Sequence, residues 1–297
     1  MVQPYLRMKT FWQTIRFLID LSRPVVMGIV NATPDSFSDG GHYFAESDPS
    51  RVLAHCDLLL KEGADMLDIG GESTRPGSPP LPLAQELARV LPVLRHAVTL
   101  GVPVSVDTYK PEVMQAALDL GVDVVNDVWA LRRSGALQVV QAHPRCGVCL
   151  MHMHRDPQTM QVAPMAGSVL PAVRTFLQSA AQSLLDAGVD RTRVVLDPGI
   201  GFGKTVAQNF ELLERQAELL SLGYPLVAGW SRKSALGAVC ATAGSGEPLP
   251  MSERLLPSVL TALLAAERGA RVLRVHDVGP TVQALKVWTA ATPFASA

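Results

Sequence analysis

Three acceptor side chains stand directly behind short apolar runs of this 297-residue sequence: Asp107, Asn126 and Asp197. A carboxylate only accepts hydrogen bonds, whereas an amide both donates and accepts them. Together they suit the edge of a flat heterocycle such as an aminopyrimidinone, whose ring N–H and amino group would face Asp197. One such residue at a strand end is commonly a helix cap, but three on separate strands favour a shared binding site.

Two basic motifs follow later apolar runs. In Ser231-Arg-Lys-Ser234, Lys233 offers a point charge to a ring oxygen or nitrogen, and the serines would hold an anion at a helix N-terminus. In Arg274-Val-His276, residues two apart on a strand point the same way, so both side chains should face one ligand, for which phosphate is suited. A solvated helix start and a frayed strand end are the respective alternatives.

Two long, glycine-rich loops carry further candidates. Asn31 opens the loop of residues 31–48, and its carbonyl oxygen is a hard ligand that Mg²⁺ accepts beside phosphate oxygens. A loop-capping amide explains Asn31 equally well. Arg75 lies in the loop of residues 70–81, where its planar guanidinium would grip a carboxylate or phosphate, unless it is an ordinary surface arginine. Such loops on a catalytic face are candidates for mobile lids.

Other chemical motifs fail on their spacing. The Asp-Pro-Gly-Ile-Gly-Phe-Gly-Lys segment that ends at Lys204 resembles a phosphate loop, but Pro198 stands where a Walker A motif needs Gly. His152 and His154 share a strand face, yet a transition-metal site would need more ligands than His276 alone supplies. The sequence therefore predicts neither a nucleotide loop nor a transition-metal site.

Eight short apolar runs must position these residues, and polar or glycine-rich residues end each run. The runs cover residues 25–30, 66–69, 102–106, 122–125, 147–151, 194–196, 225–228 and 271–275. Helical stretches alternate with them at residues 49–62, 82–100, 111–120, 133–143, 169–187, 207–220, 252–269 and 279–289. Short runs that are mainly apolar, without strict alternation, are typical of parallel strands buried on both faces. The pattern predicts an α/β fold, a single-domain (β/α)8 TIM barrel with its active site at the C-terminal ends of the strands.

Composition narrows the class of protein further. Hydrophobic residues make up 48% and charged residues 18%, which fits a globular chain with a sizeable core. A formal net charge of −1 provides no general field for nucleic acid or anionic lipid. The four scattered cysteines are predicted to be buried free thiols, which suits a reducing compartment. Residues 10–21 are too short and too charged for a signal peptide or membrane span. We therefore expect a cytoplasmic protein without nucleic-acid or membrane partners.

The motifs, taken in order, point to a known family. From about Asp20 to the end, the chain resembles the dihydropteroate synthases, folate-pathway transferases that sulfonamides target. The resemblance rests on TPDSFSDGG, GGESTRPG, SVDTYKPEV, DPGIGFGK, SRKS and RVHDV. It implies a pterin-binding barrel of residues 21–297 after an N-terminal extension of residues 1–20. It also implies condensation of a hydroxymethyl-dihydropterin diphosphate with 4-aminobenzoate, Mg²⁺ as cofactor, a homodimer, and competitive binding of sulfonamides.

The resemblance also implies a role for each motif residue. The implied pterin pocket contains Thr74, Asp107, Asn126, Met151, Asp197 and Lys233. The implied diphosphate site contains Asn31, Arg274 and His276, with Mg²⁺ at Asn31. The implied 4-aminobenzoate site contains Phe37, Arg75, Pro76, Lys233 and Ser234. The implied catalytic residues are Asp107, Lys233 and Asp35.

Two other functions stay open at this point. A methyltetrahydrofolate-dependent methyltransferase with a similar barrel would keep the Asp and Asn contacts to a pterin. It has no use, however, for the anion sites of the Ser-Arg-Lys and Arg-Val-His motifs. A non-catalytic pterin-binding relative would be expected to lack loop residues such as Asp35 or Arg75, and this chain retains both.

Overall fold

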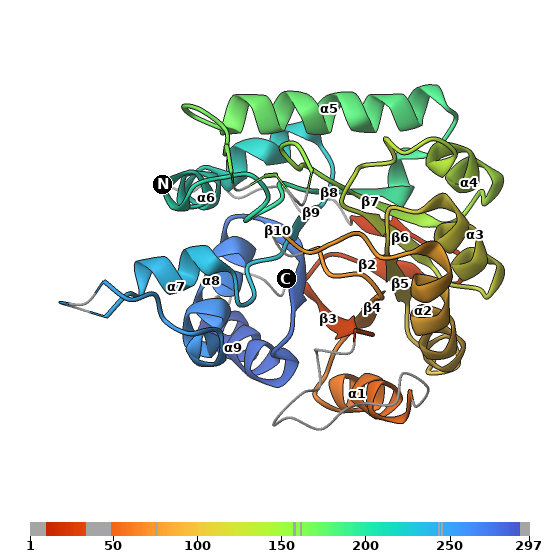
Figure 1. The fold of residues 1–297 in the computed structure, drawn as a ribbon, viewed down its shortest axis with the longest axis horizontal. Coiled ribbons are helices and arrows are strands. Elements are labelled where there is room, and N and C mark those ends of the chain that lie inside the picture. Colours follow the sequence, from red (N-terminus) through yellow and green to blue (C-terminus); the bar gives the residue numbers. More distant parts are fainter. Residues whose placement is uncertain are drawn as a thin grey trace.

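Eight parallel strands form a closed barrel at the centre of the molecule, with helices around it (Figure 1). The computed structural model describes residues 10–33, 49–74, 77–156, 159–160, 162–242, 244 and 246–291. The barrel strands are β3 (Val25–Asn31), β4 (Met66–Gly70), β5 (Val104–Asp107), β6 (Val124–Asp127), β7 (Gly147–Met151), β8 (Val194–Asp197), β9 (Leu226–Ala228) and β10 (Ala270–Val275). They neighbour one another in sequence order, and β10 closes the ring against β3. The predicted (β/α)8 barrel is confirmed.

The helices follow the strands in the predicted alternation. They are α1 (Ser50–Lys61), α2 (Leu83–Ala97), α3 (Pro111–Asp119), α4 (Ala136–Ala142), α5 (Leu170–Asp186), α6 (Val206–Glu214), α7 (Ser234–Val239), α8 (Leu255–Glu267) and α9 (Val278–Ala291). Pro111 starts α3, where its missing N–H costs no hydrogen bond. The helix predicted over residues 207–220 is instead α6 followed by a 3₁₀ segment, η3 (Gln216–Leu222).

Alternation along the strands places the polar groups at one end of the barrel interior. Side chains two residues apart on a strand point to the same face. Met66 and Val272 belong to the apolar cluster that fills the barrel interior near the N-terminal ends of the strands. Two residues further along the same strands stand Asp68 and Arg274, which contact each other. The barrel interior is therefore polar near the C-terminal ends of the strands.

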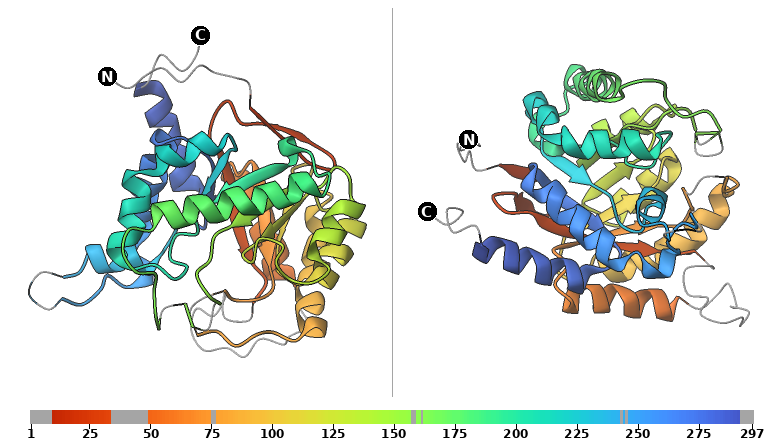
Figure 2. Two further views of the ribbon diagram at one scale, coloured as in Figure 1. Left: turned by 90° about the horizontal axis from the view of Figure 1, so that it is seen from above. Right: turned by 90° about the vertical axis from the view of Figure 1, so that its left-hand side faces the viewer.

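A small antiparallel hairpin closes the other end of the barrel (Figure 2). It consists of β1 (Phe11–Gln13) and β2 (Leu18–Asp20). Trp12 is fully buried in the apolar cluster of the barrel interior, and its indole N–H donates to the carbonyl of Arg193 at 2.9 Å. The guanidinium of Arg16 pairs with the buried carboxylate of Asp123 at 2.5 Å. The hairpin thus covers the barrel base and inserts Trp12 into its apolar interior.

The cysteine prediction is confirmed for three residues and wrong for the fourth. Cys56, Cys146 and Cys149 are buried free thiols, whereas Cys240 is exposed. Cys240 directly follows the short helix α7, where the chain turns out to solvent. Within the described residues, no helix is both long and apolar enough to cross a membrane.

Candidate active site

A buried network of charged groups forms the floor of the barrel mouth. The Arg274 guanidinium donates through Nε to Asp68 Oδ2 and through Nη2 to Asp107 Oδ2, both at 2.6 Å. Asn126 Nδ2 also donates to Asp68 Oδ2, at 3.2 Å. Strands β4, β5, β6 and β10 therefore each contribute one residue to a single connected group. Of the three acceptors predicted to share a site, Asp107 and Asn126 join this network. Arg274 links Asp107 to Asp68, and Asn126 donates to Asp68.

Asp68 is a central residue that sequence reasoning missed. Its side chain is fully buried, and its other oxygen, Oδ1, has no hydrogen-bond partner in the described residues. Asp107 Oδ1 is unpartnered in the same way. Burial raises the pKa of Asp107 because it disfavours the charged form, and Arg274 partly counteracts that rise. Two buried acceptor oxygens of the network are thus without a hydrogen-bond donor among the described residues.

Two further predicted residues, Asp197 and Lys233, come from β8 and from the segment between β9 and α7. Asp197 ends β8 and accepts the backbone N–H of Gly199 at 2.6 Å. Lys233 precedes the first residue of α7, and its ammonium lies 4.4 Å from the centre of the Phe202 ring. Loss of solvent and the nearby Arg274 lower the pKa of Lys233 to about 8.

The other cation of the Ser-Arg-Lys motif has a different partner. Arg232 forms an ion pair with Asp277 at 2.6 Å, and its backbone has a positive φ of 58°. This left-handed turn lies directly before Lys233. The motif therefore anchors itself through Arg232 while leaving Lys233 near the charged network.

The glycine-rich segment after Asp197 is held by a buried lysine. Lys204 Nζ donates to the carbonyl of Gly199 at 2.7 Å and lies 3.0 Å from His152 Nδ1. Burial and Lys204 lower the pKa of His152 to about 3, so this imidazole is neutral. A Cβ on Gly199 would lie 1.8 Å from the His152 carbonyl oxygen, so only glycine fits there. Lys204 and His152 thus fasten this segment to the end of β7.

An apolar wall flanks the network. Met151 is buried in a separate cluster with Val128, Met153, Met160 and Phe202. Tyr109 and Trp129 pack against this cluster, with ring centres 6.1 Å apart. The wall gives a flat ring an apolar surface beside the polar floor.

Four of the remaining predicted residues are described by the structure, and four are not. His276 Nδ1 lies 2.9 Å from Ser231 Oγ, so the imidazole is oriented by the Ser-Arg-Lys motif. Ser234 is exposed at the start of α7, and Thr74 is half-buried. Asn31 ends β3 and is half-buried beside Gly70 of β4. The predicted residues Asp35, Phe37, Arg75 and Pro76 lie outside the described residues.

The side chains at the barrel mouth limit the kind of metal ion that could bind there. Among the described residues there is no group of three or more His, Cys, Asp and Glu side chains that could hold an ion. Mg²⁺ commonly keeps several waters and binds through one or two protein oxygens plus substrate phosphates. The single amide oxygen of Asn31 fits an ion that arrives with a phosphate group, and it does not fit a resident all-protein site.

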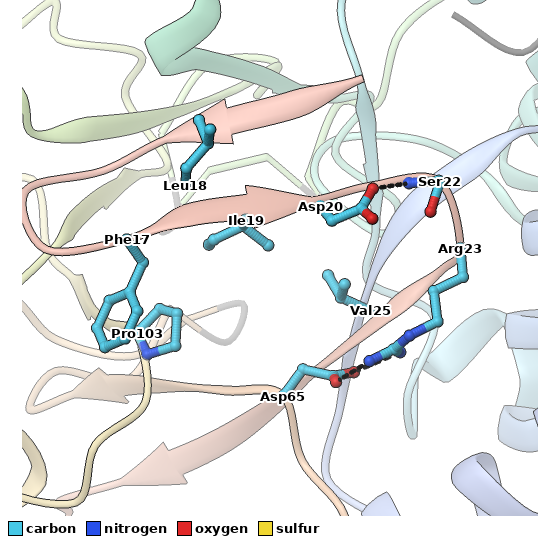
Figure 3. A pocket seen from close by; sticks show the side chains of 9 residues that line it. All are labelled: Phe17, Leu18, Ile19, Asp20, Ser22, Arg23, Val25, Asp65 and Pro103. Atoms are coloured by element: carbon cyan, nitrogen blue, oxygen red, sulfur yellow. Dashed lines mark hydrogen bonds and ion pairs between the residues drawn. The ribbon is translucent and has the colours of Figure 1, made fainter. Parts of the chain in front are cut away.

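A separate hollow of about 570 Å³ lies at the opposite end of the barrel (Figure 3). Phe17 and Leu18 of the hairpin region line it, together with the ion pair between Arg23 and Asp65. Asp65 also accepts the backbone N–H of Val26 at 2.8 Å, so its carboxylate is occupied in holding the start of β3. This hollow contains none of the predicted site residues.

The barrel carries acidic, amide and lysine side chains at its mouth. Comparison with known proteins identifies the class of protein to which it belongs. The model of the family described as pterin binding enzymes matches residues 27–276. The chain is 45% identical over 283 residues to the dihydropteroate synthase of Neisseria meningitidis serogroup B, with 94% of this chain and 96% of the relative covered. It is 42% identical over 270 residues to the dihydropteroate synthase of Escherichia coli, with 91% and 92% covered.

Solved structures agree with the sequence relatives. The Burkholderia cenocepacia dihydropteroate synthase complexed with 7,8-dihydropteroate has a TM-score of 0.84 and 47% identity, with 96% of this chain and 98% of that chain covered. The Xanthomonas albilineans enzyme with 4-aminobenzoic acid has a TM-score of 0.83 and 46% identity, with 93% and 95% covered. The chain belongs to the dihydropteroate synthase family.

Proposed function

We propose that this protein condenses 6-hydroxymethyl-7,8-dihydropterin diphosphate with 4-aminobenzoate, giving 7,8-dihydropteroate and diphosphate. The observation that carries the proposal is the convergence of Asp107, Asn126 and Arg274 on one buried network, with Asp197 and Lys233 beside it. Family membership supports it, as do the relatives' complexes with 4-aminobenzoic acid and 7,8-dihydropteroate.

The pterin would lie flat at the barrel mouth. Its pyrimidine N–H and amino groups would donate to Asp197, and the Asn126 amide would match a mixed edge. Lys233 would donate to a ring oxygen or nitrogen. Met151 supplies apolar cover from its buried cluster, and Thr74 would close one side of the pocket.

The diphosphate would leave by breakage of the bond between the pterin methylene carbon and its oxygen, and the electron pair departs with diphosphate. Arg274 and His276 would stabilise the charge that develops on it. Asn31 would hold Mg²⁺, which supplies further positive charge to the diphosphate oxygens when it is bound. Asp107, with one oxygen on Arg274 and the other unpartnered in the described residues, would stabilise the cation left at the methylene.

The arylamine would then form the new C–N bond with its nitrogen lone pair and release a proton. Asp35 would assist Asp107 in stabilising the cation until this attack. The 4-aminobenzoate would be bordered by Phe37, Arg75, Pro76, Lys233 and Ser234. A sulfonamide would compete for that position, as the sulfonamide drug complex of the Yersinia pestis relative suggests. No covalent bond to the protein is needed.

The test is a turnover assay with each component omitted in turn. We expect dihydropteroate and diphosphate in equal amounts only when pterin diphosphate, 4-aminobenzoate and Mg²⁺ are all present. Diphosphate release at the same rate without the amine would overturn the proposal.

The alternative methyltransferase function is disfavoured by a specific observation. Ser231 orients His276, and Arg232 anchors the turn before Lys233, so both anion motifs are built into the mouth. A methyl group carrier has no anionic leaving group for them to bind. Methyl transfer from methyltetrahydrofolate to a thiol acceptor, measured in a separate assay, would favour that alternative instead.

A further inference from the structure

Three consecutive residues after β5 satisfy two carboxylates from a different part of the chain. Lys110 Nζ donates to Oε2 of both Glu72 and Glu86. The Tyr109 hydroxyl donates to Glu72 Oε1 at 2.8 Å, and the Thr108 hydroxyl donates to Glu86 Oε1 at 2.7 Å. All four carboxylate oxygens therefore have a donor from Thr108–Lys110. We call these five residues the Lys110 clamp.

The Lys110 clamp is well shielded from water. The side chain of Glu86 is 1% exposed, that of Glu72 10% and that of Lys110 16%. Burial alone would lower the pKa of Lys110, but the bonds to Glu72 and Glu86 outweigh it and raise that pKa. Without the lysine, two shielded carboxylates would face each other with no cation between them, which is strongly unfavourable. Apart from the Tyr109 ring, which packs against the apolar wall, no residue of the Lys110 clamp has a role in the site described above.

The Lys110 clamp joins two segments that border the barrel mouth. Glu72 belongs to the segment after β4, two residues before Thr74. Lys110 stands three residues after Asp107, at the start of α3. The same segment after β4 is held by Arg89, whose Nη1 donates to the Gly71 carbonyl at 3.1 Å. Helix α2 carries Glu86, and helix α3 begins directly after Lys110. The two helices pack side by side (Figure 1).

The close fit at Gly71 shows how little freedom the segment after β4 has. A Cβ on Gly71 would lie 2.7 Å from Val90 and 3.2 Å from Glu86 Cγ, both on α2. Movement of Glu72 away from the clamp would therefore have to carry residues 71–74 outward. Such a shift displaces Thr74 relative to Asp107, and Arg75 and Pro76 follow Thr74 directly in the chain.

We propose that Lys110 is a positioning residue that fixes residues 71–74 against α2 and the β5–α3 junction. Its task is to hold residues 71–74, which directly precede Arg75 and Pro76 of the proposed 4-aminobenzoate site in the sequence, without touching either substrate. This inference rests on the proposed function for its kinetic readout. It predicts that the amine half-site depends on Lys110 more strongly than the pterin half-site, in which Thr74 would move but Asn126 and Asp197 would stay in place.

The central variant is Lys110→Met, which keeps the apolar stem and removes the charge. Because misplacement by about 1 Å can cost up to about 100-fold in rate, we expect the KM for 4-aminobenzoate to rise about 10-fold or more. Affinity for a pterin analogue, measured by calorimetry without the amine, should fall by a smaller factor than the amine KM rises, because of the pterin contacts only Thr74 would be displaced. Lys61→Met, at the exposed end of α1, is the matched control and should change neither value.

Two further variants separate positioning from general loss of structure. Lys110→Met combined with Glu72→Gln removes one of the two uncompensated negative charges and should reverse part of the rise in the amine KM. Tyr109→Phe removes only the 2.8 Å donor to Glu72 and should shift the amine KM in the same direction by less. Amide hydrogen exchange of residues 70–74 should speed up in Lys110→Met, and this readout needs no turnover.

Several outcomes would overturn the proposal. It fails if Lys110→Met matches Lys61→Met in amine KM and in exchange at residues 70–74. It also fails if pterin-analogue affinity falls as much as amine affinity, or if the double variant is worse than Lys110→Met. Absence of dihydropteroate formation by the wild type would instead count against the proposed function, and hydrogen exchange would still decide on the Lys110 clamp.

Discussion

At the scale of single residues, Asp68 connects the groups proposed to contact the pterin with those proposed to contact diphosphate. Asn126 and Arg274 both donate to its Oδ2 atom. Removing one partner from a buried ion pair leaves the other charge uncompensated, which costs about 3–5 kcal/mol. The position of Arg274 therefore depends on a residue that need not touch the substrate.

Asp68→Asn tests this dependence with almost no change of shape. We expect kcat/KM for the pterin diphosphate to fall at least about 10-fold because Arg274 loses one of its two carboxylate partners. The control is Asp65→Asn, which alters the ion pair with Arg23 at the barrel base. Equal kcat/KM values for the two variants would contradict the role given to Asp68.

Lys233 gives the site a characteristic dependence on pH. Its pKa falls from the usual 10.5 to about 8, because loss of solvent and Arg274 both disfavour the ammonium. The charged form is present below about pH 8 and is lost as the pH rises through that value. We therefore expect kcat/KM for the pterin diphosphate to decline above about pH 8.

Lys233→Arg separates this titration from that of the substrate. Arginine keeps its charge throughout this range, so the decline should disappear in the variant even though its maximal rate is lower. A pH profile that declines equally in wild type and variant would assign the decline to the substrate or to another group.

At the scale of elements, the segment between β8 and α6 is held closely against the end of β7, beside the proposed pterin pocket. Gly199 has a φ of +71°, and its α-carbon faces the His152 carbonyl with no room for a side chain. Lys204 then holds the segment from inside. The segment is accordingly a rigid edge of the site.

Gly199→Ala should break that edge. Gly188→Ala is the matched control because Gly188 also has a positive φ, of 80°, with no atom within 4 Å of an added Cβ. The control should lose only about 1 kcal/mol of unfolding free energy from backbone strain. Gly199→Ala should in addition weaken binding of a pterin analogue at least about 10-fold. Similar analogue affinities for the two variants would show that the segment tolerates displacement.

The elements also show what a sequence can and cannot predict. The apolar runs and the polar residues behind them were sufficient to predict the barrel and the strand-end positions of Asp107 and Asp197. The hairpin was missed because its three-residue strands carry too little pattern to distinguish them from a loop. Asp68 was missed because an acid between apolar neighbours shows its partner only after strands far apart in the chain have met.

At the scale of the whole molecule, the outer surface carries an apolar patch on one side. Leu255, Leu256 and Leu260 of α8 are 44%, 76% and 53% exposed. Helices α8 and α9 lie together on that side (Figure 2). The patch supports the proposal that the protein is a homodimer through its barrel helices. The division into an extension of residues 1–20 and a barrel of residues 21–297 also stays a prediction.

Leu256→Asp tests the homodimer. Burying one leucine contributes about 1.5–3 kcal/mol, so a charge there should weaken association at least about 10-fold and shift the mass measured by sedimentation toward the monomer. Leu18→Asp is the control, since Leu18 is 58% exposed on the hairpin at the barrel base. A wild-type protein that is monomeric at all concentrations would contradict the proposal.

The most direct test of the central claim is a crystal structure with a pterin diphosphate analogue. We predict the ring at the barrel mouth, with its edge on Asn126 and Asp197, Lys233 within hydrogen-bond distance, and the diphosphate directed toward His276. A ring bound elsewhere, such as in the hollow beside Arg23 and Asp65, would contradict the claim that these strand ends form one catalytic site.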